Sequence, residues 1–280
     1  MILSFHPIIE ADENIICAGR QPDEHDLSAI RRAHAVILPQ GCSEALYHMA
    51  RSHCPHVFPN LDIRFAYPGK IGQIRLFRKL ELPHPRTELY EDLLDLERRP
   101  STIPLPVVVK LNYGGQGDTV FLADTPDTLE KALETIRACE RTGQKGFLIQ
   151  QFICTRDRSL RIAVIHRRLV AYWRIAPGRF GTSVAQGAHI VHEADPHLRE
   201  AAAQVVRDVC RKTGLQLAGF DFIFAAEDLE AGRIEPLALE INYFFGRTGL
   251  GGSQNYYRIL EREVDTWLSE TGLRRHFKKV

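Results

Sequence analysis

The stretch of sequence that decides the fold is GFDFIFAAEDLEAGRIEPLALEIN, residues 219–242. Both of its halves alternate with a period of two, which predicts two β-strands, and the polar run between them is long enough to reverse the chain. On one expected face of this antiparallel hairpin lie Phe220, Phe222, Phe224, Leu237, Leu239 and Ile241. On the other face lie Asp221, Ile223, Ala238, Glu240 and Asn242.

Three side chains on that second face offer oxygen ligands: Asp221, Glu240 and Asn242. Pairing of the strands could bring two carboxylates and an amide together in a small volume. Oxygen ligands of this kind suit Mg²⁺, which proteins usually hold through one or two carboxylates together with substrate phosphates. The alternative is a solvated sheet face on which these are ordinary polar residues.

Length and composition describe an ordinary globular chain. The 280 residues are 44% hydrophobic and 25% charged, which allows a large core. Lys and Arg number 36 against 35 Asp and Glu, a balance that indicates neither nucleic acid nor a membrane surface as a partner. No apolar run approaches the length of a membrane span, and the first residues lack the pattern of a signal peptide.

The six cysteines are scattered and include no CxxC pair, so reduced thiols and a cytoplasmic location are expected. Several metal-binding residue types lie close together in the sequence: Cys42, His48, His53, Cys54 and His56. A structural zinc site is an alternative interpretation of this group, although its spacing matches no familiar zinc finger.

The first 66 residues predict a small α/β unit with a parallel sheet, because strand-like and helical patterns alternate. The strand-like runs are residues 2–5, 14–18, 35–38, 57–58 and 63–66. The helical patterns are residues 23–33 and 42–52. A basic amphipathic helix at residues 69–80 and the connector LPHPRT, residues 82–87, then mark the likeliest boundary, and a charged helix is expected at residues 88–99.

A glycine-rich loop lies within PVVVKLNYGGQGDTVFL, residues 106–122. A buried strand ends there in Lys110, the glycines follow, and a second strand returns. Backbone N–H groups of such a loop could fold over a phosphate chain, with Lys110 as a point charge. The alternative is a hairpin whose glycines only satisfy the geometry of the turn.

The remaining elements are read from their patterns. Helices are expected at residues 125–142, 195–213 and 253–270, and strands at residues 147–153, 159–165 and 169–175. Arg161 and Arg174 lie on two of these strands, where an isolated cation would be costly unless it meets an anion. Arg247 lies on the glycine-rich segment FFGRTGLGG after the hairpin.

Taken in order, these pieces resemble the ATP-grasp superfamily, and most closely its RimK-type and glutathione-synthase-like carboxylate–amine ligases. The pieces are the helix with Lys70, LPHPRT, VVVKLNYGGQG, QQFI, SLRIAV, GFDFIF and LEIN, within roughly residues 67–268. The resemblance implies an α/β ATP-grasp fold in three parts: a short Rossmann-like unit at residues 1–66, a connector helix and lid subdomain at 67–152, and a C-terminal antiparallel-sheet subdomain at 153–280. The nucleotide would lie between the last two.

The resemblance also implies a role for each site residue. The lysines would contact the phosphates, the glycine loop would be a lid, and residues 150–153 would meet the adenine. The ATP-binding set is Lys70, Lys110, Gly114, Gly115, Gln116, Gly117, Gln150, Gln151, Phe152, Ile153 and Ser159. The catalytic set is Arg161, Arg174 and Arg247, and the ligands for Mg²⁺ or Mn²⁺ are Asp221, Glu240 and Asn242.

Some positions depart from the family pattern. An acidic hinge residue is replaced by Gln151, a ribose-binding Asp by Ser159, and a Pro after the lysine by Leu111. A lid glycine is replaced by Thr119, and a common Asn by Ser183. These departures leave the substrate unidentified.

The implied reaction activates a carboxylate as an acylphosphate, releases ADP, and lets an amine displace phosphate to form an amide. The expected partners are ATP and small-molecule or peptide carboxylates and amines, and self-association as a homo-oligomer stays open. Two alternatives remain: a small-molecule kinase that uses the same site, and a nucleotide-binding regulatory module without turnover.

Overall fold

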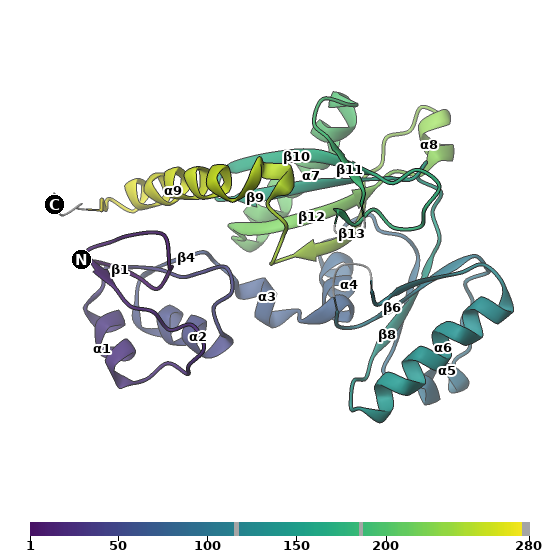
Figure 1. Cartoon of the computed structure of the whole chain (residues 1–280), viewed down its shortest axis with the longest axis horizontal. Helices are drawn as coiled ribbons and strands as arrows, with labels where there is room; N and C mark the ends of the chain where they lie inside the picture. Colours follow the sequence, from purple (N-terminus) through teal and green to yellow (C-terminus); the bar gives the residue numbers. More distant parts are fainter. Residues whose placement is uncertain (115–117, 185–186, 276–280) are drawn as a thin grey trace.

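The computed structural model describes residues 1–114, 118–184 and 187–275. Three sheets make up the molecule in Figure 1: an N-terminal unit (purple), a central unit (teal, lower right) and a C-terminal unit (green) whose sheet lies above and between them. This mixed α/β architecture agrees with the fold class expected from the sequence. In the described part of the chain, no helix combines the length and apolar character needed to cross a bilayer.

The N-terminal unit is a parallel sheet packed against two helices. Its strands are β1 (Ile2–Ser4), β2 (Glu13–Asn14), β3 (Ala35–Ile37) and β4 (His56–Phe58), in the order β2-β1-β3-β4. Its helices are α1 (Glu24–Arg32) and α2 (Glu44–His53). Both helices are capped, because Asp23 accepts backbone N–H bonds at the start of α1 and Ser43 does so for α2. The predicted parallel α/β unit is confirmed.

The geometry does not support the zinc interpretation. Within the described ranges, the only three His, Cys, Asp or Glu side chains with ligand atoms within 4.8 Å of one another are Asp23, His25 and Asp26. That group is explained by the start of α1, where Arg20 donates two hydrogen bonds to the Asp26 carboxylate. Cys42 is buried in the core of the N-terminal unit.

The prediction of a strand at residues 63–66 is wrong, because Asp62–Ala66 forms the short helix α3. The Asn60 side chain accepts the N–H of Asp62, and the Tyr47 hydroxyl donates to the Asp62 carboxylate at 2.7 Å, which anchors the first turn. Only Ile63 of this helix is buried, so its apolar residues do not form one face of a strand.

The predicted connector helix is confirmed as α4 (Gly69–Lys79), and its buried residues pack onto the C-terminal sheet. From this helix, Gln73 clamps the edge strand β13 (Leu237–Asn242). Its amide nitrogen donates to the Ile241 carbonyl at 2.9 Å, and its oxygen accepts the Ile241 N–H at 2.8 Å. The clamp positions the strand that carries Glu240 and Asn242.

The central unit is an antiparallel sheet in the order β5-β8-β6-β7. Its strands are β5 (Thr87–Tyr90), β8 (Phe147–Gln151), β6 (Val107–Leu111) and β7 (Val120–Ala123), and its helices are α5 (Leu93–Arg98) and α6 (Pro126–Arg141). The prediction of a single helix at residues 88–99 is wrong in its first half, where strand β5 forms instead. Tyr90 stacks on Phe147 of the paired strand with ring centroids 5.1 Å apart, and Asp92 caps a helix that begins only afterwards.

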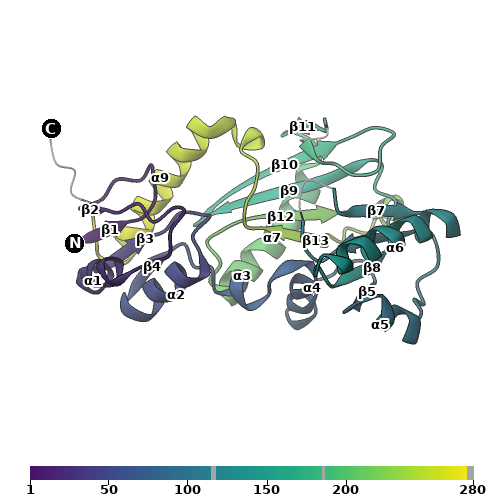
Figure 2. The same cartoon turned by 60° about the horizontal axis from the view of Figure 1, so that its bottom comes forward.

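The C-terminal unit is a five-stranded antiparallel sheet in the order β11-β10-β9-β12-β13. Its other strands are β9 (Arg158–Ile165), β10 (Arg168–Ile175), β11 (His189–Val191) and β12 (Leu217–Ile223). Its helices are α7 (Pro196–Thr213), α8 (Ala226–Glu230), the 3₁₀ turn η2 (Thr248–Leu250) and α9 (Gly252–Glu270). Helix α7 packs in one core of this sheet, whereas α9 packs in another that includes β1, β3 and β4. Figure 2 shows α9 (yellow) beside the N-terminal unit.

The decisive hairpin forms as β12 and β13, but one detail of its predicted alternation is wrong. Asp221 pairs with Glu240, whereas the next residue, Phe222, pairs with Ala238, so the register shifts by one residue. Because of this irregularity, Ala238 rather than Leu239 enters the core beside Phe222. Leu239 instead lines a cavity together with Glu240.

Candidate active site

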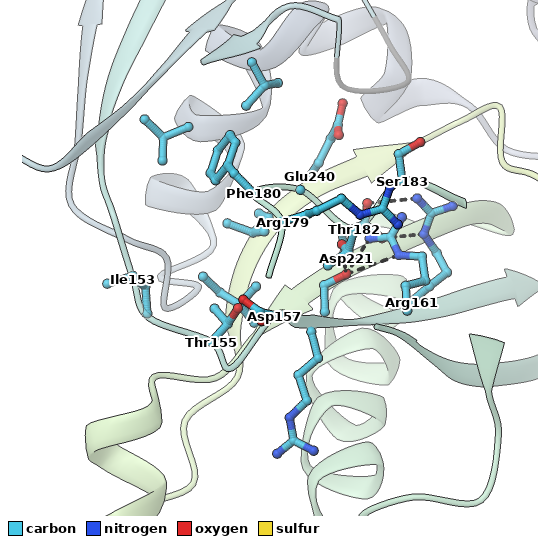
Figure 3. A pocket seen from close by; sticks show the side chains of 18 of the residues that line it. Ile153, Thr155, Asp157, Arg161, Arg179, Phe180, Thr182, Ser183, Asp221 and Glu240 are labelled. Atoms are coloured by element: carbon cyan, nitrogen blue, oxygen red, sulfur yellow. Dashed lines mark hydrogen bonds and ion pairs between the residues drawn. The ribbon is translucent and has the colours of Figure 1, made fainter. Parts of the chain in front are cut away.

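A cavity of about 970 Å³ is lined by the central and C-terminal units, a volume within the range of small-molecule sites. Its walls come from β6, β7 and β8, residues 150–159, the segment 178–184 between β10 and β11, and the hairpin. Figure 3 shows Arg161, Asp221, Glu240 and Thr182 gathered at this cavity. The hairpin and the strands before it therefore bring most of the predicted site residues to one place.

A buried charge cluster centres on Asp221. Arg161 donates to both of its oxygens, one of them at 2.8 Å, and Arg174 approaches Oδ1 at 2.9 Å. Asn242 donates its amide to Oδ2 at 3.0 Å. Burial alone would raise the pKa of Asp221, but the two guanidinium groups outweigh it and lower the pKa below its usual value. Asp221 is therefore an ionised carboxylate whose oxygens already have partners.

Glu240 is the more accessible carboxylate, with 31% of its side chain exposed. Strand pairing places it opposite Asp221, and its Oε1 lies 4.0 Å from the Nζ of Lys70. The same ammonium group donates to the carbonyl of Gly114 at 3.0 Å. Burial lowers the pKa of Lys70, and the carboxylate of Glu240 only partly offsets this effect.

Lys110 projects from β6 and donates to the side-chain oxygen of Gln150 at 2.7 Å. Gln150 in turn donates to the Thr87 hydroxyl at 2.8 Å, and Thr87 donates to the Pro85 carbonyl at 2.7 Å. Burial lowers the pKa of Lys110 to about 8, against the opposing effect of Glu240. The resemblance implied that residues 150–153 meet the adenine, and it gave no sign of this side-chain contact, which the pairing of β6 with β8 creates.

Residues 150–153 line the cavity, and several apolar side chains line it as well. The apolar lining residues near them are Val108, Val120, Leu122, Ile153, Ile223 and Leu239. The predicted hinge residues Gln151 and Phe152 are also among the lining residues. An apolar lining suits a ring such as a purine, and the adenine contacts of residues 150–153 stay a prediction.

Ser159 lines the cavity, but its hydroxyl is hydrogen-bonded to other side chains of the chain. Its hydroxyl accepts from Arg174 at 2.9 Å and lies 2.5 Å from the Thr182 hydroxyl. It therefore ties the segment 178–184 to the charge cluster. Gly178 and Gly181 flank Arg179 and Phe180 in that segment, a glycine signal that the sequence analysis did not use.

The predicted lid lies partly outside the described residues. Of its members, Gly114 is described, whereas Gly115, Gln116 and Gly117 are not. Gly114 has φ +114°, and a Cβ at this position would lie 2.4 Å from the side chain of Thr119, so only glycine fits.

Arg247 does not reach this cavity. Its guanidinium lies over the rings of Tyr256 and Tyr257, 4.8 and 4.6 Å from their centroids, and it lines a second, smaller cavity. The cavity is also lined by Tyr172, which was not predicted and which lies beside Arg161 and Arg174. Burial raises the pKa of Tyr172, which keeps the phenol protonated.

Comparison with known proteins agrees with this architecture. Residues 69–250 match the family model of the RimK-like ATP-grasp domain. A probable alpha-L-glutamate ligase of Xanthomonas oryzae pv. oryzae is 32% identical over 153 residues, which are 53% of this chain and 47% of that protein. The chain thus spans about half the length of the curated relatives it matches.

Solved structures show the same fold. A RimK domain ATP-grasp protein from Sphaerobacter thermophilus superposes with a TM-score of 0.61 at 15% identity, covering 94% of this chain and 98% of that one. The D-alanine–D-alanine ligase of Bacillus anthracis, solved with ATP, superposes with a TM-score of 0.60 at 14% identity, covering 92% and 86%. The family model covers most of this chain, including every element that builds the cavity from α4 to η2, and the chain belongs to the RimK-like ATP-grasp family.

Proposed function

We propose that the chain is an ATP-dependent ligase that joins a carboxylate to an amine and releases ADP and phosphate. The observation that carries this proposal is the charge of the large cavity. Its described lining cations are Lys70, Lys110, Arg156, Arg158, Arg161, Arg174 and Arg179, whereas its lining carboxylates are Asp157, Asp221 and Glu240. A cavity that is lined by a surplus of cations and by apolar side chains suits a polyphosphate attached to a purine.

In the proposed reaction, a carboxylate oxygen of the first substrate attacks the γ-phosphorus of ATP. The bond to the β–γ bridging oxygen breaks, and ADP leaves. An amine then attacks the acyl carbon, the bond to the phosphate oxygen breaks, and the amine gives up a proton to solvent. Lys110, Arg161 and Arg174 would offset the charge that develops on the phosphoryl oxygens, and no side chain forms a covalent bond.

Mg²⁺ is the proposed metal, and the donors at Glu240 fit it. The partly exposed Glu240 carboxylate is 4.0 Å from its lysine neighbour, and Asn242 uses its nitrogen toward Asp221 and keeps its oxygen for another partner. Asp221 would join these donors only by exchanging a guanidinium partner. When bound, the ion would neutralise charge on the terminal phosphates.

The names of the relatives suggest the substrates to test first. Curated relatives are named alpha-L-glutamate ligases, and a D-alanine–D-alanine ligase shares the fold. The name of the curated relatives specifies a ligase, and this favours the ligase over the kinase. L-glutamate is therefore the first amine substrate to supply.

Hydroxylamine trapping tests this proposal. The protein is incubated with Mg-ATP, a pool of carboxylic acids and hydroxylamine, and we expect a hydroxamate together with ADP and phosphate. A stable phosphate ester without hydroxamate would instead identify a kinase. Binding of ATP without ADP release from any acid would identify a regulatory module.

A further inference from the structure

Four residues of the C-terminal sheet form one row across four neighbouring strands. Tyr172 on β10 pairs with Arg161 on β9, and Arg161 pairs with Asp221 on β12. Asp221 in turn pairs with Glu240 on β13. Directly opposed residues of antiparallel strands project their side chains to the same face of the sheet. Tyr172 therefore extends the row of charged site residues, and all four of these residues line the large cavity.

The ring of Tyr172 is held against the backbone of Gly249, a residue of η2. A Cβ added to Gly249 would lie 2.2 Å from the ring carbon that bears the hydroxyl, and 2.4 Å from each of the two carbons beside it. Gly249 does not have a positive φ, so the space that this ring occupies, and not the backbone conformation, explains why a glycine is present. The contact fixes the place of the Tyr172 hydroxyl in the cavity wall.

The Tyr172 hydroxyl has a proton to donate. Within residues 1–114, 118–184 and 187–275, it donates this proton to no protein group. Burial raises the pKa of Tyr172 by more than the charges of Arg161 and Arg174 lower it, so the hydroxyl stays protonated. Guanidinium groups are donors only and cannot accept that proton. The hydroxyl is therefore available to an oxygen atom of a molecule bound in the cavity.

The charge cluster beside this hydroxyl favours an anion. Arg161 and Arg174 share a single carboxylate, that of Asp221, so the three groups together keep one positive charge. Arg174 follows Tyr172 by two residues on β10, so both side chains lie on the same face of the sheet. An anion bound by the two guanidinium groups would thus lie on the face that carries the hydroxyl.

We propose that Tyr172 is a catalytic residue, whose hydroxyl donates a hydrogen bond to an oxygen of the γ-phosphoryl group while that group passes from ATP to the carboxylate substrate. The carboxylate oxygen forms the new bond to phosphorus, and ADP takes the electron pair of the bond that breaks. The proton of Tyr172 stays on its oxygen throughout. A donor that is already in place stabilises the charge on the phosphoryl oxygens without reorganisation. This inference rests on the proposed ligase function.

Isothermal titration with Mg-ADP and with the non-hydrolysable ATP analogue Mg-AMPPNP tests the inference, because the ratio of the two affinities reports the contacts of the γ-phosphoryl group. Tyr172→Phe removes the hydroxyl and keeps the ring against Gly249. We expect this variant to lower the preference for the analogue by about tenfold, the value of a hydrogen bond to a charged group, and to bind Mg-ADP as the wild type does. Its hydroxamate formation should fall by about tenfold or more.

Two further variants make the test specific. Gly249→Ala keeps the hydroxyl but displaces the ring, and it should also lower the preference for the analogue. Tyr90→Phe is the matched control, since its hydroxyl donates to Glu88 at 2.9 Å in the central unit, and it should leave the ratio unchanged.

A ratio in Tyr172→Phe equal to that of the wild type would overturn the inference. Equal weakening of both nucleotides would also overturn it, because the hydroxyl would then support only the fold. A wild type that binds neither nucleotide would contradict the proposed ligase function itself, and the inference with it.

Discussion

The cationic side chains on two walls of the large cavity have different contact partners. On the C-terminal wall, Arg161 and Arg174 share the buried carboxylate of Asp221. On the part of the lining that we call the lysine wall, which comes from β6 and α4, Lys110 is bonded to the neutral amide of Gln150, and Lys70 is bonded to the Gly114 carbonyl, with the Glu240 carboxylate 4.0 Å away. Each pair of cations has one carboxylate nearby, but Asp221 is in direct contact with both guanidinium groups, whereas Glu240 comes no closer than 4.0 Å to Lys70.

This difference predicts which wall controls the stability of the fold and which controls nucleotide affinity. A buried ion pair contributes little net stability, but breaking it by removing one partner leaves an uncompensated charge. Burial of the two lysines carries a desolvation cost that the Glu240 carboxylate only partly offsets, and this cost is visible in the lowered pKa of both Lys70 and Lys110. A phosphate would relieve that cost. We therefore expect changes on the C-terminal wall to affect stability first, and changes on the lysine wall to affect nucleotide affinity first.

The largest expected effect is on the C-terminal wall. Asp221→Asn should lower the free energy of unfolding by about 3–5 kcal/mol, because two buried guanidinium groups lose their shared counter-charge. Urea unfolding measures this change. Asp208→Asn is the matched control, since it removes an exposed pair with Arg211 and should cost no more than about 1 kcal/mol. Equal losses in the two variants would contradict the comparison.

On the lysine wall, Lys110→Met should weaken binding of Mg-ATP by about tenfold to a hundredfold, the value of a hydrogen bond to a charged group. Isothermal titration measures the affinity. Lys145→Met, which removes an exposed lysine of the same unit, should leave the affinity unchanged. If Lys110→Met bound Mg-ATP with the affinity of the wild type, the prediction that Lys110 contacts the phosphates would be wrong.

The lysine wall should also respond to pH. Because the pKa of Lys110 is about 8 when folded and 10.5 in its unperturbed form, the protonated lysine is lost above about pH 8. Affinity for Mg-ATP should fall by up to about tenfold per pH unit above that point. The unfolded chain binds more protons in this window, so stability should rise with pH while affinity falls. Lys110→Arg should flatten the affinity profile, and a profile unchanged by that substitution would assign the titration to another group.

The smallest expected effect concerns the backbone that holds Lys70. Gly114→Ala should weaken Mg-ATP binding by about 1 kcal/mol or more, because its Cβ would meet Thr119 at 2.4 Å and displace the carbonyl that accepts from Lys70. Gly143→Ala is the control: this glycine also has positive φ, but nothing lies within 4 Å of its Cβ position. Similar effects of the two substitutions would show that backbone strain alone matters.

The sequence predicted the hairpin, and with it the gathering of Asp221, Glu240 and Asn242, because alternation with a period of two is a local signal. It did not predict the register shift beside Asp221, since a bulge of one residue leaves no mark on the hydrophobic pattern. It also did not predict β5, where the helix-forming preference of Glu88 and Leu89 is overridden by pairing with β8.

Site geometry was harder to predict where it depends on contacts between distant residues. Arg161 and Asp221 are 60 residues apart in the chain, so their pairing required the order of strands in the sheet. The resemblance grouped Arg247 with Arg161 and Arg174, but Arg247 lies over two tyrosines of α9 and lines a different cavity. The roles of the site residues in catalysis stay predictions.

The most direct test of the central claim, that this cavity activates a carboxylate with ATP, is hydroxamate formation by Glu240→Gln. The substitution removes one negative charge at nearly constant shape, and Glu235→Gln is an exposed control from the same hairpin. We expect Glu240→Gln to retain measurable Mg-ATP binding while hydroxamate formation falls by about a hundredfold or more, and we expect the control to behave as the wild type. Hydroxamate formation by Glu240→Gln at the wild-type rate would place the chemistry elsewhere and contradict the account.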